Sequence, residues 1–259
     1  MTPKKNKKIS WVRILLRGIT YLLALILVLM AVAYGIAAVN EKRILERLNE
    51  KLQTAINGNI QVGGLSFTLF EDFPTFSISL SNIYLRGPQY EKYHHDFFNA
   101  EKIYINIQPL QLITGTISLQ SIKIKNANVY VFRASDGYTN MDTFKKKDKS
   151  DTVAKTGFKP TIDLKEISFE NTQLMYFDSV KRKSYGLRFE KTDLTLESTD
   201  SSKKLSIAGG IFFNGMMLNE SKGRYLKDKA TQAKLDLEVV RGVPGFLLLP
   251  SVLQFEKST

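Results

Sequence analysis

A run of 22 residues without a charged side chain, Gly18 to Val39, limits the possible folds of this chain more than any other feature. As an α-helix it would be roughly 33 Å long, enough to cross the hydrocarbon core of a bilayer. Trp11 and Tyr34 lie toward its two ends, where aromatic anchors are common. The sequence Ala31-Val32-Ala33 resembles a signal-peptide cleavage site, but the apolar run is longer than such peptides contain. We therefore predict an uncleaved transmembrane helix over residues 18–39.

The distribution of charge predicts how this helix is oriented. Half of the net charge of +12 lies in residues 1–17, which carry six basic residues and no acidic one. Under the positive-inside rule this flank is cytoplasmic. The opposite flank mixes Lys and Arg with Glu41, Glu46 and Glu50. We therefore expect a single-pass protein of the inner membrane with a cytoplasmic N-terminus and a periplasmic main domain. This topology argues against nucleic acid as a partner.

Residues 40–58 have the pattern of an amphipathic helix. Ile44, Leu48, Leu52 and Ile56 recur every four residues, with Leu45 and Ala55 beside them, and charged side chains occupy the other face. We predict a juxtamembrane helix here. Two interpretations stay open at this point: the helix packs on the following domain, or it caps the membrane-proximal end of a β structure.

From residue 59 onward the apolar period changes to two, which is typical of strands with one apolar and one polar face. In residues 103–108, for example, Ile alternates with Tyr, Asn and Gln. The expected fold class is mainly β, with a curved antiparallel sheet over residues 59–259. A polar segment at 145–158, which includes the sequence KKKDK, is expected to be a mobile loop.

The strand region contains an internal repeat. Residues 117–132 match residues 162–177 at an offset of 45, and the matching pairs include Asn126 with Asn171 and Phe132 with Phe177. Residues 78–85 match residues 117–124 at an offset of 39. A recurring strand–turn–strand unit predicts a sheet that is built by serial addition of strands.

The chain shows no pattern of catalytic or metal-binding residues. Without cysteine it has no disulfide, thiolate zinc site or cysteine nucleophile. The two histidines, His94 and His95, are adjacent, so on a strand they would point to opposite faces. The pair Gly63-Gly64 predicts a turn or bulge, not a phosphate-binding loop. We expect no enzyme activity, no cofactor and no metal.

The order of the elements resembles a known family. A basic flank, one anchor and an amphipathic helix precede the segment GNIQVGGLSFTLFEDFPTFSISLSNIYLRG at residues 58–87. PLQLITG at residues 109–115 and the strand pair at residues 117–132 follow. This arrangement is similar to the N-terminal region of AsmA-like proteins, which are related to TamB and to the chorein-type bridge proteins.

The resemblance implies a repeating β-groove that conducts phospholipids between membranes, or a scaffold for outer-membrane protein assembly. Its expected partners are phospholipid acyl chains, the inner membrane and other envelope proteins. Family members are generally longer, so a groove of this length is expected to span only part of a periplasm. Residues 243–254 are apolar and are expected to be a strand that lacks a neighbour or a segment that contacts a membrane or partner.

The alternation itself fits two structures equally well. A second sheet covers the apolar face in a sandwich, whereas acyl chains cover it in a groove. The resemblance favours the groove. By strand parity, the side chains expected to contact lipid are Ile103, Ile105, Ile107, Leu119, Ile122 and Ile124.

Overall fold

A computed structural model describes residues 17, 20, 21, 28, 35, 39–68, 76–107, 118–145, 161–199, 201–241, 245 and 247–255. Residues 43–259 form one compact unit, and residues 1–42 belong to another. Most of the predicted transmembrane helix, 18–39, and of the predicted loop, 145–158, lies outside the described residues. Within the described part of the chain, no helix is both long and apolar enough to cross a membrane.

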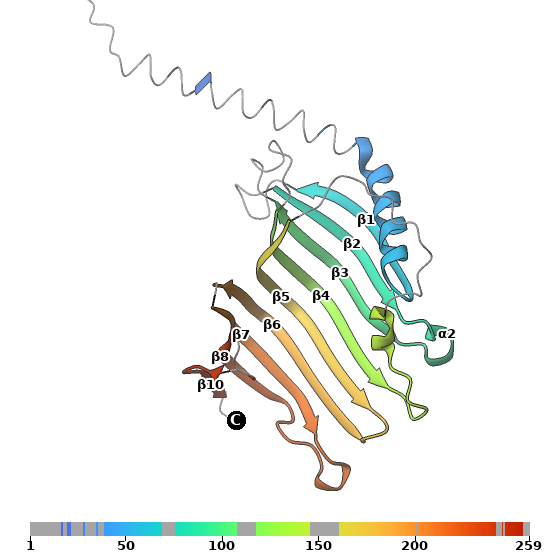
Figure 1. Ribbon diagram of the computed structural model, residues 1–259, viewed down its shortest axis with the longest axis vertical. Helices are drawn as coiled ribbons and strands as arrows, with labels where there is room; N and C mark the ends of the chain where they lie inside the picture. Colours follow the sequence, from blue (N-terminus) through green and yellow to red (C-terminus); the bar gives the residue numbers. More distant parts are fainter. Residues whose placement is uncertain are drawn as a thin grey trace, which may run out of the picture. The chain divides into compact units, whose positions relative to one another are not determined.

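The unit over residues 43–259 is mainly β, as predicted. Ten strands form one open sheet in the described ranges, in the order β1-β2-β3-β4-β5-β6-β7-β8-β10, with β9 also paired to β8 (Figure 1). The strands are β1 (Asn59–Thr68), β2 (Phe76–Arg86), β3 (Asp96–Ile107), β4 (Ser118–Arg133), β5 (Thr161–Asp178), β6 (Lys183–Ser198), β7 (Ser202–Met217), β8 (Lys229–Val240), β9 (Leu247–Leu248) and β10 (Val252–Phe255). The short helices are α2 (Tyr90–Tyr93), η1 (Asn140–Phe144) and η2 (Glu220–Lys222).

One pair of strands corrects the prediction of an antiparallel sheet. β4 and β5 are parallel, whereas the other neighbouring strands are antiparallel. Parallel neighbours need a crossover connection of about a dozen residues or more. The chain between Arg133 and Thr161 is long enough to provide one. The alternation of apolar residues could not reveal this, because it is the same in both strand directions.

The parallel pairing explains the internal repeat. Over most of its length β4 pairs with β5 at an offset of 45, so Ile122 lies beside Ile167 and Phe132 beside Phe177. The repeated segments are therefore neighbours in register in one sheet. The offset of 39 has no such meaning, because β3 separates β2 from β4.

A row of extra residues bends the sheet. Along a strand, residues that face the apolar side normally alternate with single residues that face the other side. At one point in each of strands β1 to β6, two residues lie between them instead of one, as between Leu80 and Ile83 or between Ile124 and Ala127. The pairing register is the same on both sides of this level from β1 to β6, so the extra residues lie side by side. We call the row the crease; its residues are Gly63, Asn82, Glu101, Asn126, Asn171 and Glu190.

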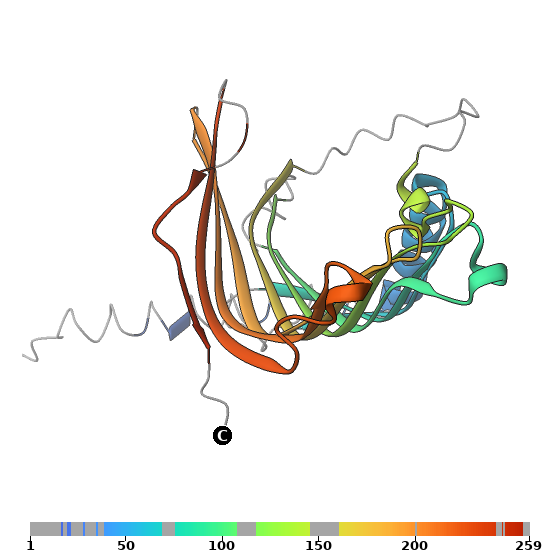
Figure 2. The same cartoon turned by 90° about the horizontal axis from the view of Figure 1, so that it is seen from below.

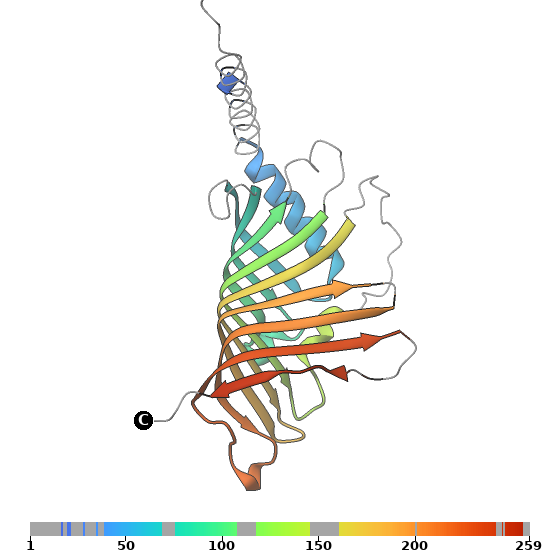
Figure 3. The same cartoon turned by 90° about the vertical axis from the view of Figure 1, so that its left-hand side faces the viewer.

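The crease has its own backbone and side-chain chemistry. Asn82, Asn126 and Asn171 have φ values of 51°, 50° and 49°, a left-handed conformation that Asn adopts more readily than most residues. Asn126 Nδ2 donates to Glu101 at 2.6 Å, and Asn171 Nδ2 donates to Asn126 Oδ1 at 2.8 Å. Bulges bend and twist strands. Figure 3 shows the strands bending along their length, and Figure 2 shows the resulting curved, open sheet.

A helix covers the free edge of β1. Residues 43–55, the edge helix, run beside this strand (Figure 1). Asn49 Nδ2 donates to the Val62 carbonyl oxygen at 3.0 Å, and Asn49 Oδ1 accepts from the Val62 N–H at 2.8 Å. Gln53 also donates to the Ile60 carbonyl oxygen. These bonds occupy backbone groups that another strand would need, so further pairing at this edge is blocked.

The opposite edge of the sheet lacks such a cover among the described residues. All four residues of β10 are exposed, and Val252, Leu253 and Phe255 are apolar. Residues 243–254, expected to be a strand without a neighbour or a contact segment, contain β9 and most of β10, and both strands pair with β8 on one side. The sheet therefore has one edge that is closed by a helix and one edge strand that is exposed.

Candidate functional site

One face of the sheet is apolar in every long strand. It carries four of the predicted lipid-contacting side chains, and across β3 and β4 Ile103 lies opposite Ile124 and Ile105 opposite Ile122. Ile107 and Leu119 lie in these strands, but their side chains are outside the described residues. Parity thus brings the predicted residues together. Their contact with lipid stays a prediction.

The edge helix covers this apolar face at the β1 end. Leu45, Leu48 and Leu52 pack against a cluster of buried residues from β1 to β4: Val62, Leu65, Leu80, Ile83, Ala100 and Ala127. Ile103, Ile105 and Ile124 pack against the same cluster. The predicted lipid residues therefore border a closed core, so the more open part of the face lies further along the sheet.

Two adjoining cavities lie on the apolar face over β4 to β7. The first has a volume of about 240 Å³ and is lined by Val129, Phe169, Thr172, Leu174, Phe189, Thr192, Leu194 and Ile207. The second has a volume of about 640 Å³ and is lined by Val131, Met141, Leu174, Tyr176, Lys181, Lys183, Tyr185, Leu187, Phe213 and Met216. Both share Leu174, and we call them together the trough. Binding pockets for small molecules have similar volumes and largely apolar linings.

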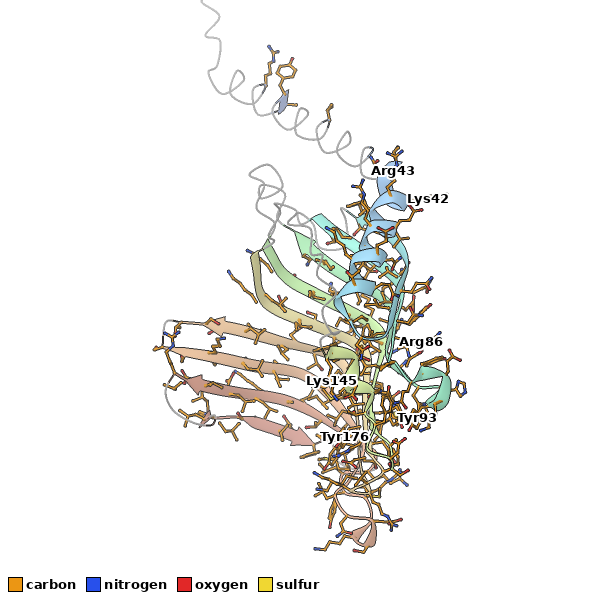
Figure 4. All side chains as sticks on the ribbon, turned by 45° about the vertical axis from the view of Figure 1, so that its right-hand side comes forward. Lys42, Arg43, Arg86, Tyr93, Lys145 and Tyr176 are labelled. Atoms are coloured by element: carbon orange, nitrogen blue, oxygen red, sulfur yellow. The ribbon has the colours of Figure 1, made fainter. Side chains whose placement is uncertain are left out.

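The trough runs along the strands from the crease to the turn between β5 and β6. Along β5 its lining passes from Phe169, beside the crease, through Leu174 to Tyr176, which is labelled in Figure 4. The Tyr176 ring stacks on Tyr185 with a centroid distance of 5.4 Å. An elongated apolar molecule could therefore lie along the strands.

The opposite face of the sheet carries polar side chains that form hydrogen bonds across the strands, together with exposed apolar side chains such as Met175 and Phe177. Ser77 Oγ donates to Asn106 Oδ1 at 2.6 Å, and Asn106 Nδ2 donates to Ser121 at 2.9 Å, which links β2, β3 and β4. Further along, Ser206 donates to Asp236, and this bond is the main reason that the Asp236 pKa is lowered.

Asp178 organises the turn at the end of the trough. Its carboxylate accepts from the Lys181 N–H at 2.8 Å and from the Tyr176 hydroxyl at 3.2 Å. The bond from Lys181 lowers the pKa of Asp178. Burial, and then the bond to Asp178, raise the pKa of Tyr176. Asp178 is therefore hydrogen-bonded within its own turn and strand, and Lys181 and Lys183 of this turn line the trough.

Basic and aromatic side chains gather around α2 and pair with acidic neighbours. The Arg86 guanidinium pairs with Asp96 at 2.7 Å and lies over the Tyr90 ring at 4.1 Å. Lys92 bonds to Asp136 at 2.7 Å, which raises the pKa of Lys92 and lowers that of Asp136. Both members are exposed, so the pair adds little stability. Figure 4 labels Arg86, at the end of β2, and Tyr93, at the end of α2.

The two histidines have separate aromatic neighbours. His94 ends α2 with φ of 54° and meets the Tyr90 ring edge-on, whereas His95 packs edge-on against Tyr130. No group of three or more His, Cys, Asp or Glu side chains in the described ranges could hold a metal ion. The histidines thus belong to the packing of a loop between two strands.

The sequence did not single out the trough residues. Leu187 lies between Gly186 and Arg188, much as Ile105 lies between Tyr104 and Asn106, whereas Leu174 is followed by Met175 and Phe213 by Asn214 after Phe212. The signal was present but did not discriminate, because alternation marks the face and not what covers it. Only the position of the edge helix distinguishes the closed part of this face from the open part.

A family model described as the AsmA family matches residues 12–245, which is most of the 259-residue chain. No curated protein and no solved structure matches the chain.

Proposed function

The chain belongs to the AsmA family, and from this premise we propose that its curved sheet binds phospholipids and carries them between envelope membranes. The acyl chains lie on the apolar face, in the trough. The observation that carries the proposal is the open trough itself. In the described part of the chain, no second sheet lies over β4 to β7.

The physical basis of the activity is the shielding of apolar tails from water. Each methylene removed from water contributes roughly 0.8 kcal/mol. The trough offers aliphatic and aromatic side chains from four neighbouring strands for this purpose. A bound lipid exchanges one apolar contact for a similar one as it moves, so no bond chemistry is needed. The AsmA family is not a known enzyme family, and we propose a binding role without catalysis.

The proposed location follows from the sequence. Residues 18–39 anchor the chain in the inner membrane with residues 1–17 in the cytoplasm, and the sheet lies in the periplasm. This topology puts the trough in the aqueous compartment that a lipid would have to cross between two membranes.

A second function is favoured by the exposed edge strand. β10 presents apolar side chains and an edge that no described residue covers at the end of the sheet order, and such edges bind strands of other proteins. In this alternative the protein is a scaffold for the assembly of outer-membrane proteins. A stoichiometric protein partner that co-purifies without lipid, and is lost when β10 carries a proline, would support it.

The first function is tested by photo-crosslinking in living cells. A photoreactive residue replaces Leu174 in the trough and, in a matched control, the adjacent Gln173, which parity places on the polar face. Phospholipid attached at position 174 and not at 173 is the expected result. The pair Ile105 and Asn106 tests the residues predicted from sequence in the same way. Absence of lipid at both Leu174 and Ile105 in folded protein would contradict the proposal.

A further inference from the structure

The end of the trough is strongly basic. The turns over residues 178–183 and 218–229 join β5 to β6 and β7 to β8 and lie at the same end of the sheet (Figure 1). They contain seven basic residues and three acidic ones: Lys181, Arg182, Lys183, Lys222, Arg224, Lys227 and Lys229 against Asp178, Glu220 and Asp228. Arg182 Nη1 lies 2.7 Å from Glu220 Oε2 and thereby joins the two turns. We call this feature the basic rim.

Two lysines of the basic rim line the trough, and neither forms a salt bridge in the described part of the chain. Lys181 and Lys183 both line the larger cavity. Among the described residues, neither ammonium group lies within salt-bridge distance of a carboxylate. Each acidic residue of the rim has another partner: Asp178 accepts from the Lys181 N–H, Glu220 pairs with Arg182, and Asp228 lies 4.0 Å from Lys227.

The polarity of the trough changes in one direction. At the crease its lining is aliphatic and aromatic, and its two threonines are buried. Toward the rim the lining passes to two tyrosines and then to two lysines. An amphiphile with one apolar end and one anionic end matches this gradient in a single orientation.

From this gradient we infer that the trough selects anionic phospholipids and binds them in one orientation. Lys181 and Lys183 bind the phosphate-bearing headgroup at the basic rim, and an acyl chain runs along β5 and β6 toward the crease. This inference rests on the proposed function and adds the ligand class and the headgroup residues. Charge-assisted hydrogen bonds from ammonium groups to phosphate oxygens supply the recognition.

A simpler role for the two lysines would be to cover apolar surface without binding the headgroup. Long lysine side chains often cover apolar surface with their methylene groups while the charge stays in water. In that role Lys181 and Lys183 would contribute to lipid binding through their stems alone. Substitution by Gln keeps much of the stem and removes the charge, so it separates the two roles.

The experiment uses the purified full-length chain in amphipol and two photoactivatable lipids with the same acyl chains. One is an anionic phosphatidylglycerol and the other a zwitterionic phosphatidylcholine. Capture is quantified by mass spectrometry, which also maps the attachment site. The test variant is Lys181→Gln/Lys183→Gln. The matched control is Lys102→Gln/Lys191→Gln, which removes the same charge from exposed positions that line neither cavity.

The expected result is preferred capture of the anionic lipid by the parent, with attachment on β5 or β6. In the test variant the preference for the anionic lipid falls roughly threefold to tenfold, because two exposed charge pairs contribute about that much to binding. The control variant keeps the preference of the parent. Equal capture of both lipids by the parent would overturn the inference and leave the proposed function intact. Capture of neither lipid would instead contradict the proposed function.

Three further outcomes would also overturn the inference. Equal losses in the test and control variants would show general attraction by net charge. Displacement of the anionic lipid by an equal concentration of inorganic phosphate would show a free-anion site. Weaker binding of the test variant to anionic vesicles, with unchanged capture in the trough, would show that the rim docks on a membrane surface.

Discussion

Replacing Leu174 with Asp places a carboxylate at the point where the two cavities of the trough meet. Leu174 lines both of them, lies between Val129 of β4 and Leu187 of β6 in the sheet, and is half-buried in the free protein. A bound acyl chain would cover the rest of its side chain. The substitution therefore acts on lipid binding more than on the core under the edge helix.

The expected loss follows from two contributions. Full burial of a leucine side chain is worth about 1.5–3 kcal/mol, and about half of this remains to be gained when lipid binds. A carboxylate against an acyl chain adds a desolvation cost, which entering water reduces to about 1–2 kcal/mol. Together they weaken binding by about 2–3 kcal/mol, or roughly 30-fold to 150-fold.

The assay is the amount of phospholipid that co-purifies with the full chain, measured by mass spectrometry, with circular dichroism as the check on folding. Gln173→Asp is the matched control, because it introduces the same charge one residue away on the polar face. If Leu174→Asp does not fold, Leu174→Gln tests the same contact without a charge. A folded Leu174 variant that keeps the lipid content of the parent would refute the reasoning.

The remaining predictions concern the fold that positions the trough. Asn49→Ala leaves the buried backbone groups of Val62 unpaired, so unfolding becomes easier by about 2 kcal/mol and the Val62 amide exchanges faster with deuterium, while Glu50→Ala has no such effect. Asn126→Val at a φ of 50° destabilises the sheet by about 1–2 kcal/mol more than Asn126→Gly, and equal melting temperatures would contradict this. The pKa of Asp178 is lowered from 3.8, so its ionised form stabilises the turn above about pH 4, and this contribution is lost as the pH falls through the lowered folded-state pKa. Asp178→Asn should therefore make the free energy of unfolding less dependent on pH in acid. If the parent and the variant lost stability in parallel as the pH falls, this prediction would be wrong.

Several features of the fold could be predicted from local patterns. Alternation in segments such as residues 103–108 placed the strands and assigned each side chain to a face, because successive side chains on a strand point to opposite sides. The Gly63-Gly64 pair lies in the middle of β1, where the crease passes, and so is not a turn. The match between Asn126 and Asn171 marked positions that share one backbone conformation.

Other features depended on contacts between distant parts of the chain. The same alternation in β4 and β5 could not show that these strands are parallel. Nor could it show that the extra residues of six strands lie in one row. An extra residue in a single strand appears in the sequence only as an interruption of the alternation. It forms part of a crease only when the neighbouring strands have an extra residue at the same point along the sheet.

By itself the sequence determined the membrane-spanning prediction, the β class, the two chemically different faces and the resemblance to one family. These properties follow from the order of apolar and polar residues within short segments. The tertiary structure alone decided which part of the apolar face is closed and which is open. Asn49, Leu48 and Leu52 bring the edge helix onto β1, and β5 to β7 lie too far along the sheet for it to cover. Coverage of a face depends on what packs against it, and that is not encoded in the period of any single strand.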